Sequence, residues 1–236
     1  MIPASPWIAL AALALLWLFS GPDPARRAWA LAALATLALF LALRALSQVV
    51  PGGQWIGNNW DWRGPLLGLA GVLGVAALLV RKGMLEWRDA GITLAQARGS
   101  MPIALGITTV ALGVNYALMS LSSFRLPGVQ LETWLYQATL PGLVEETVFR
   151  GVLLALAERA VGAGHPHWDV MGARIGWGGM LVTLVFLALH GISLGTVLGV
   201  LPAALLYLWL RQRTGSLLLP IVAHNLWNLS VYAAHL

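Results

Sequence analysis

Long apolar runs separated by short polar loops follow one another along the whole chain. A membrane-spanning helix needs ~20 mostly apolar residues, and runs of about this length predict eight spanning helices. The predicted spans are 7–20, 28–47, 64–81, 101–121, 141–160, 175–191, 193–211 and 216–235. Only helices or closed barrels satisfy their backbone groups in lipid. The predicted fold class is therefore an all-α, polytopic membrane helical bundle.

Two stretches depart from this simple pattern. The first run is short, but Gly21-Pro22-Asp23-Pro24 is not the usual small-residue cleavage site of a signal sequence. We therefore expect a retained helix. Residues 130–139 form a separate, partly amphipathic piece. Because proline lacks a backbone N–H and suits the first turn of a helix, we expect Pro141 and Gly142 to break the backbone before the next span.

The composition supports a membrane protein. Of 236 residues, 59% are hydrophobic and 10% charged, and the mean hydropathy is +0.79; a soluble domain carries about 25% charged residues. No loop is large enough to fold alone, which predicts one membrane domain over 1–236, with variable N-terminal spans in 1–100 and the candidate chemistry in 101–236. We expect an integral multi-pass protein of the plasma membrane, surrounded by lipid. The absence of cysteine excludes disulfides, thiolate metal sites and a cysteine nucleophile.

The net charge of +5 and pI of 10.4 do not indicate a nucleic-acid partner, because basic residues in short loops orient the spans. On one predicted side lie only Arg63 and Arg125. The ten basic residues of the other side are Arg26, Arg27, Arg81, Lys82, Arg88, Arg98, Arg159, Arg174, Arg211 and Arg213. This asymmetry predicts that both chain ends face away from the cytoplasm.

Two polar residues lie in spans that carry no other candidate chemistry. Arg44, near the end of the second span, is expected to extend toward the membrane interface. Asn115, inside the fourth span, is expected to hydrogen-bond a neighbouring helix rather than line a cavity.

Only two of the nine acidic residues, Glu145 and Glu146, lie well within a predicted span. A charge at this depth costs ~2.5–3.5 kcal/mol even on lenient insertion scales. Glu146 and Arg150 are four residues apart and share a helix face, which predicts an ion pair. Glu145 points about 100° away and has no such partner. We therefore expect Glu145 to be the working carboxylate; the alternative is that all three charges only link helices.

Two later spans carry histidines. His190 ends the span 175–191 with Phe186 on the same face, and His224 shares a face with Asn228. Taken alone, His190 is typical of a helix cap. His224 and Asn228, taken alone, are typical of hydrogen bonding between helices. Antiparallel spans, however, bring His190 to the depth of Glu145. A carboxylate, two imidazoles and an amide can activate water and stabilise an oxyanion.

Three motifs occur in order on successive apolar spans: Glu-Glu-x-x-x-Arg at 145–150, Phe-x-x-x-His at 186–190 and His-x-x-x-Asn at 224–228. Together they resemble the CPBP (Abi) family of intramembrane proteases, over roughly residues 101–235. That family includes CAAX prenyl endopeptidases of the Ras-converting type and bacterial proteins linked to bacteriocin processing or immunity. The resemblance implies an intramembrane endopeptidase.

The resemblance also implies roles for individual residues. Glu145 and His190 correspond to the pair that activates water, and His224 and Asn228 to the positions that hold the oxyanion. The supporting positions are Glu146, Arg150 and Phe186. The implied substrate is a peptide or lipidated protein that enters from the membrane interface, with prenylated CAAX-type C-termini as the precedent. The charge count places the Glu145 end of the bundle on the non-cytoplasmic side, whereas a CAAX-type role requires cytoplasmic access.

Several alternatives remain at this stage. The helical zinc motif His-Glu-x-x-His is missing, and Asn228 beside His224 suits a donor better than a ligand. Both facts favour a mechanism without a cofactor. Zinc held by Glu145, His190 and His224 is the other possibility. A non-catalytic membrane scaffold or immunity protein is an alternative function. A proton-coupled transporter is less favoured, because no internal repeat is present.

Overall fold

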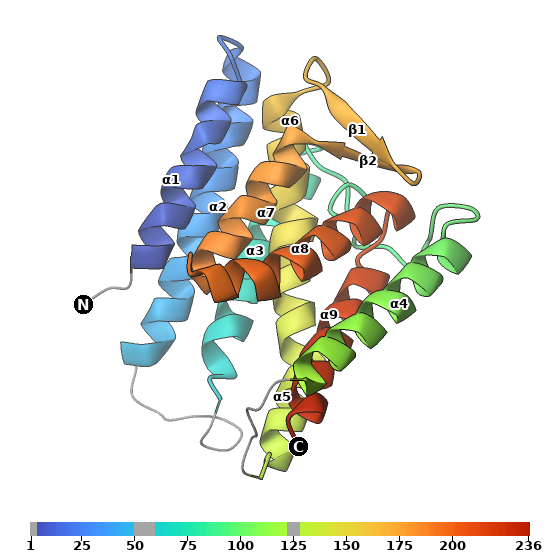
Figure 1. The fold of residues 1–236 in the computed structure, drawn as a ribbon. Coiled ribbons are helices and arrows are strands. Elements are labelled where there is room, and N and C mark those ends of the chain that lie inside the picture. The colour runs from blue at the N-terminus through green and yellow to red at the C-terminus, as the bar shows by residue number, and fades with distance from the viewer. Residues whose placement is uncertain (1–3, 50–59, 122–127) are drawn as a thin grey trace.

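The computed structural model describes residues 4–49, 60–121 and 128–236, so Arg125 lies outside the described residues. The elements are α1 (Ala4–Phe19), α2 (Pro24–Val49), α3 (Arg63–Arg81), α4 (Met101–Ser120), α5 (Leu131–Pro141), the π-helix η1 (Gly142–Leu153), α6 (Leu154–Val161), β1 (His167–Val170), β2 (Ala173–Gly176), α7 (Trp177–His190), α8 (Leu194–Thr214) and α9 (Leu218–Ala234). Figure 1 shows that α5, η1 and α6 continue one another as a single rod. The described helices thus form eight rods, and the predicted all-α bundle is confirmed.

The apolar runs account for these helices. Among the described residues, α2, α3, α4 and α8 are long and apolar enough to cross a membrane, and Pro6–Phe19 and Trp177–His190 are shorter apolar helices. Bulky apolar side chains on several helices point outward, among them Leu78, Val110 and Leu198. Such a surface suits a lipid environment rather than water.

The rod formed by α5, η1 and α6 occupies the middle of the bundle (Figure 1). Its η1 segment packs against α3, α7 and α9, while α6 packs against α2 and α7. Three aromatic rings join the layers, because Phe149 on η1 contacts Phe40 on α2 and Phe186 on α7 edge-on. The chemistry-bearing motif 145–150 is therefore central rather than peripheral.

The prediction that Pro141 and Gly142 break the backbone is wrong. Pro141 has helical angles (φ −57°, ψ −53°), and the rod continues through it. Pro141 offers no N–H to the helix, and the Gly142 N–H donates to Asn225 Oδ1 of α9 at 2.8 Å. Because the α-helical ladder is weakened at two successive positions, the next 12 residues adopt the wider π-helical pattern.

A short hairpin, β1–β2, was not predicted. It lies between α6 and α7, with Trp168 opposite Ile175. Met171 and Gly172 at its tip both have positive φ, 47° and 80°, as a two-residue type I′ turn requires. The hairpin is held to the bundle where Trp209 Nε1 donates to the Val170 carbonyl at 2.8 Å.

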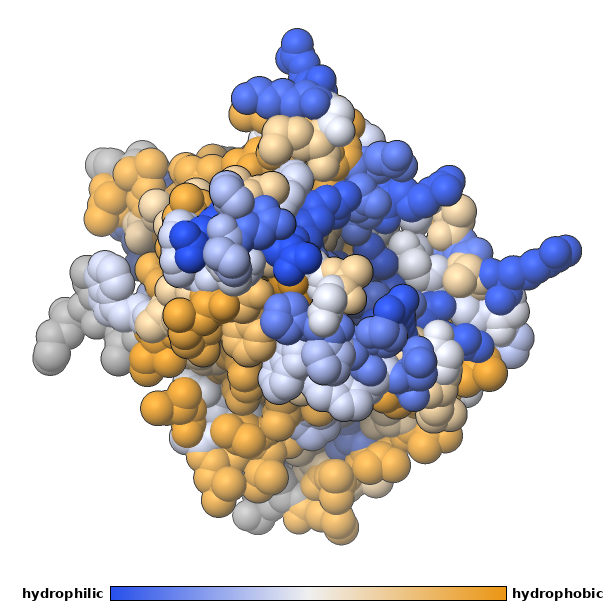
Figure 2. Space-filling view, turned by 90° about the horizontal axis from the view of Figure 1, so that it is seen from above, coloured by the Kyte–Doolittle hydropathy of each residue, from blue (hydrophilic) through white to orange (hydrophobic). Residues whose placement is uncertain are grey.

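Basic loop residues meet at the hairpin end of the bundle. Arg159 Nη2 lies 2.7 Å from Asp89 Oδ2, and Arg211 Nη2 donates to the Asp89 carbonyl at 2.7 Å. Figure 2, which views this end, shows hydrophilic residues gathered on it. The C-terminal end of α9 lies at the opposite end (Figure 1). The gathering of basic residues at one end of the bundle agrees with the predicted charge asymmetry between the two sides. Which end faces the cytoplasm stays a prediction.

The expectation for Asn115 is confirmed. Its Nδ2 donates to Ser230 Oγ at 2.8 Å, and Asn115 is buried between α4 and α9. A buried amide needs such a partner in an apolar surrounding. This hydrogen bond joins α4 to the helix that carries His224 and Asn228.

Candidate active site

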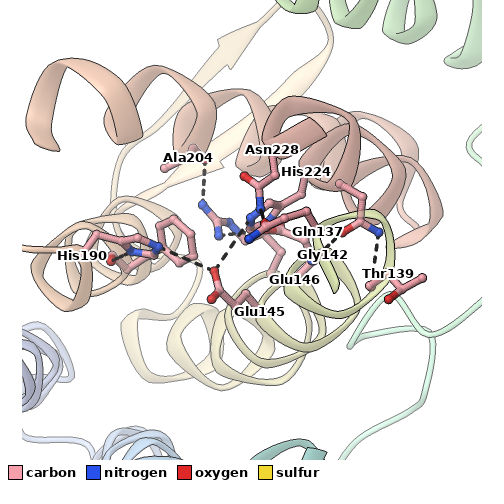
Figure 3. Close-up of polar contacts among 12 residues, drawn as sticks. Gln137, Thr139, Gly142, Glu145, Glu146, His190, Ala204, His224 and Asn228 are labelled. Carbon is pink, nitrogen blue, oxygen red and sulfur yellow. Dashed lines mark hydrogen bonds and ion pairs between the residues drawn. The ribbon is translucent and has the colours of Figure 1, made fainter. Parts of the chain in front are cut away.

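Glu145 and Glu146 project from η1 in different directions (Figure 3). Glu145 Oε2 lies 3.8 Å from His190 Nε2 of α7 and 3.9 Å from His224 Nε2 of α9. Three helices therefore bring one carboxylate and two imidazoles together. The antiparallel spans had predicted that His190 lies at the depth of Glu145. Glu145 and His190 are partly accessible, with 20% and 35% of their side chains exposed. The group opens toward the surface on this side.

Glu146 faces the interior and is fully buried. Its Oε1 lies 3.2 Å from Arg150 Nη1, so the predicted ion pair is confirmed. The same oxygen lies 2.7 Å from His224 Nδ1. Buried charges are tolerated when they are paired and hydrogen-bonded. Glu146 thus links its own helix to α9 at the level of the site.

Arg150 also contacts α7 and α8. Its Nη2 donates to the Ala204 carbonyl of α8 at 3.0 Å. Its guanidinium carbon lies 4.1 Å from the centroid of the Phe186 ring and 5.5 Å from that of Tyr207. Cation–π contacts of this kind strengthen when water is excluded. Phe186 therefore supports the site by packing between Arg150 and His190, whose ring centroid lies 4.4 Å from its own.

The hydrogen bond of His190 fixes its tautomer. Nδ1 lies 2.9 Å from the Phe186 carbonyl, which can only accept, so Nδ1 carries a proton. In the neutral ring, Nε2 then presents a lone pair toward Glu145. His190 also lies in the last turn of α7, where Gly191 (φ 108°) ends the helix.

His224 is oriented by two contacts besides Glu145. Its Nδ1 faces Glu146, and its ring stacks on Tyr207 with centroids 4.7 Å apart and planes at 13°. The side chain is 6% exposed. His224 therefore lies between the two glutamates, with Nε2 toward Glu145 and Nδ1 toward Glu146.

Asn228 lies one turn beyond His224 on α9, and Figure 3 shows the two side by side. Its Nδ2 donates to Gln137 Oε1 on α5 at 2.9 Å. An amide nitrogen has two hydrogens, so one donor is used and one is left. Among the described residues Asn228 forms no hydrogen bond or ion pair with Glu145, and its side chain is partly buried.

Residues 127–230 match the family model described as Type II CAAX prenyl endopeptidase Rce1-like. The matched segment contains all three motifs and each of the side chains just described. This match assigns residues 127–230 to the CAAX protease family. Together with the apolar helices, the match indicates an integral membrane protein and, in general, a CAAX-type intramembrane protease, a family that implies a peptide or prenylated protein as substrate. No curated protein and no solved structure matches the chain.

Sequence reasoning missed three residues that organise this CAAX protease site. Gln137 accepts a hydrogen bond from Asn228, and Tyr207 stacks on His224. Asn225 accepts a hydrogen bond from the Gly142 N–H, where the π-helix begins. Gln137 and Asn225 are amides in apolar stretches, and that polarity was the available signal. Tyr207 carried no signal, because an aromatic residue in a span is ordinary.

The CAAX protease site also bears on zinc. Glu145, His190 and His224 have the right donor chemistry, and both imidazoles have a partner on Nδ1, as metal ligands usually do. Within the described ranges, however, no three side chains of the ligand types are placed to hold a metal ion. The closest approaches, 3.8 and 3.9 Å, join Glu145 to each histidine. The choice between a metal-free and a zinc mechanism is addressed by the proposal below, in which no step runs through a metal.

Proposed function

We propose that this CAAX-type protease cleaves its substrate with a water molecule activated by Glu145 and without a metal ion. The observation that carries the proposal is the convergence of two imidazole Nε2 atoms on Glu145 Oε2 at 3.8 and 3.9 Å. These separations are too long for direct hydrogen bonds and suit a bridging water. Glu145 Oε2 is buried and has no hydrogen-bond partner among the described residues.

In the proposed reaction, Glu145 takes a proton from the water, and His190 Nε2 accepts a second hydrogen bond from it. The oxygen of the resulting hydroxide attacks the carbonyl carbon of the scissile peptide bond. The proton held by Glu145 then passes to the leaving nitrogen, and the C–N bond breaks. The products are a carboxylate and an amine. General-base catalysis of this kind contributes ~10²–10⁴-fold to the rate.

The oxyanion formed during attack requires hydrogen-bond donors. We propose that protonated His224, through Nε2–H, and Asn228, through its free Nδ2 hydrogen, supply them. The buried Glu146 supports this role because its Oε1 lies 2.7 Å from Nδ1 of His224 and so orients Nε2 toward the site. Loss of one such donor typically lowers the rate by ~10²–10³-fold.

The proposed substrate is a prenylated peptide C-terminus of CAAX type, in keeping with the family. The decisive experiment is cleavage of a farnesylated CAAX peptide by the purified protein in detergent. Wild type, Glu145→Ala and the control Glu86→Gln are assayed, each with and without a strong zinc chelator. Glu86 lies in the exposed α3–α4 loop and has no part in the site.

We expect cleavage by wild type and Glu86→Gln, with or without chelator, and none by Glu145→Ala. Loss of wild-type activity in chelator would contradict the metal-free mechanism and make the histidines and Glu145 ligands. If the folded wild type left the peptide intact, prenyl peptides would be excluded as substrates. The non-catalytic scaffold would then be the better hypothesis.

A further inference from the structure

Arg44 is an arginine of α2 that the site described above does not use. It is half-buried, and its guanidinium carbon lies 5.6 Å from the centroid of the Phe40 ring. Phe40 precedes Arg44 by one turn, so the side chain folds back toward the middle of α2. The guanidinium thus packs on its own helix, and its position relative to the membrane interface stays a prediction.

Arg44 also has no carboxylate partner within the parts of the chain that the structure describes. All nine acidic residues lie in the described ranges, and none is within ion-pair distance of this guanidinium. By contrast, Arg150 pairs with Glu146 and Arg159 with Asp89. An unpaired cation inside a span is unfavourable and indicates a functional partner.

The helix packing places Arg44 level with Glu145. The rings of Phe40 on α2 and Phe149 on η1 meet with centroids 6.2 Å apart, and the two helices run in opposite directions (Figure 1). Arg44 is four residues after Phe40, and Glu145 is four residues before Phe149. At a rise of about 1.5 Å per residue, both lie about 6 Å from the aromatic contact on the same side.

Arg44 and Glu145 also face a common region. Three charged groups, Arg44, Glu145 and Asp61, lie in the electrostatic surroundings of the Tyr136 phenol on α5. The Tyr136 ring stacks on Trp60 with centroids 4.6 Å apart. The axes of packed helices are about 8–10 Å apart. The guanidinium and the working carboxylate are thus separated by roughly the length of a short peptide.

We propose that Arg44 binds the C-terminal carboxylate of the substrate, an inference that rests on the proposed cleavage of CAAX-type termini. A CAAX terminus cut after its cysteine releases three residues, which span at most ~10–11 Å when extended. With the scissile carbonyl at Glu145, the free carboxylate of the terminus reaches the region of Arg44. The planar fork of a guanidinium binds a carboxylate through two parallel hydrogen bonds. Arg44 then selects chain ends over internal peptide bonds.

The test compares two farnesylated peptides of the same sequence, one ending in a free carboxylate and one in a carboxamide. For wild type, Arg44→Gln and Arg63→Gln, the ratio of kcat/KM for the acid to that for the amide is measured. Because each ratio is taken within one variant, a lower fraction of folded protein cancels. Arg63 is the matched control, since it lies at the same end but its Nη2 donates to the Ser47 carbonyl.

We expect wild type and Arg63→Gln to prefer the acid by roughly 10- to 100-fold, mainly through KM, as loss of a hydrogen bond to a charged group implies. In Arg44→Gln the ratio should fall to about 1. Arg44→Met gives the same comparison if the glutamine variant does not fold. Equal cleavage of both peptides by wild type, or an unchanged ratio in Arg44→Gln, overturns this inference alone. A wild type that cleaves neither peptide overturns the proposed function as well.

Discussion

Nδ1 of His224 lies 2.7 Å from Oε1 of Glu146, across 78 residues of sequence. Glu146 is the inner member of the Glu-Glu pair and is completely buried. The contact turns what the sequence presents as a simple Glu-Arg ion pair into a three-residue group that also orients the imidazole of His224. The outer glutamate is thereby left to face the exposed side of the site.

Replacing Glu146 by glutamine should lower activity although Glu145 is untouched. The amide oxygen still accepts a hydrogen bond from His224, but it lacks the negative charge of the carboxylate. The bond that orients the oxyanion donor is therefore weaker. We expect kcat to fall by ~10²–10³-fold with little change in KM. The measurement is steady-state cleavage of the farnesylated peptide by protein that elutes as a folded species. A normal kcat in folded Glu146→Gln would contradict the charge argument. Glu146→Asp, which keeps the charge, should retain more activity.

Replacing Arg150 by lysine should destabilise the bundle. Lysine keeps the charge but cannot bind Glu146, donate to the Ala204 carbonyl and lie flat on Phe186 at the same time. We expect the free energy of unfolding to fall by about 1–3 kcal/mol. Thermal unfolding in detergent measures this change. Arg159→Lys is the control, because its pair with Asp89 is about one-third exposed and should matter by less than ~1 kcal/mol. Equal shifts in both variants would refute the prediction.

Gly142→Ala should disturb the packing of α9 against the first residue of the π-helix η1. A Cβ at this position would lie 2.5 Å from Asn225 Oδ1 and 2.5 Å from the Ile221 carbonyl, so α9 would have to move. Overpacking of this kind costs about 1–3 kcal/mol, and the movement also displaces His224. We expect a lower unfolding temperature and lower kcat. In the control Gly74→Ala, on an exposed face of α3 with nothing within 4 Å, both quantities should be unchanged or higher. An unaffected Gly142→Ala would mean that α9 does not depend on this close approach.

Gln137→Leu should lower activity by acting through Asn228. The hydrogen bond from Asn228 Nδ2 to Gln137 Oε1 orients the amide, and leucine removes the acceptor. We expect kcat to fall about 10-fold. KM should stay within about 2-fold of the wild-type value, because the substitution alters the support of an oxyanion donor and not a contact that binds the substrate in its ground state. Gln137→Glu, which still accepts, should be closer to wild type.

A double mutant separates this positioning role from a general structural one. If Gln137 acts through Asn228, then Gln137→Leu added to Asn228→Ala should lower kcat no further. Additive losses in the double mutant would show that the two residues act independently. Unfolding temperatures of all three variants serve as the control for folding.

Local sequence patterns were enough to predict much of this protein. Hydrophobic runs predicted the eight rods, because a run of this length has few alternatives in lipid. The pairing of Glu146 with Arg150 followed from helical periodicity, which brings residues four apart onto one face. The order of the three motifs indicated the family that the match over 127–230 bears out.

Other features depend on how the rods pack. The bonds from Glu146 to His224, from Gln137 to Asn228 and from Asn225 to Gly142 each join residues more than 75 positions apart. The π-helix begins at the last of these contacts, where the Gly142 N–H donates both to the Thr139 carbonyl of its own rod and to Asn225 Oδ1 of α9. The hairpin needed positive φ at Met171, which residue type alone does not favour. Periodicity within a helix determines which side chains share a face; which face meets which partner is decided only when the helices pack against one another.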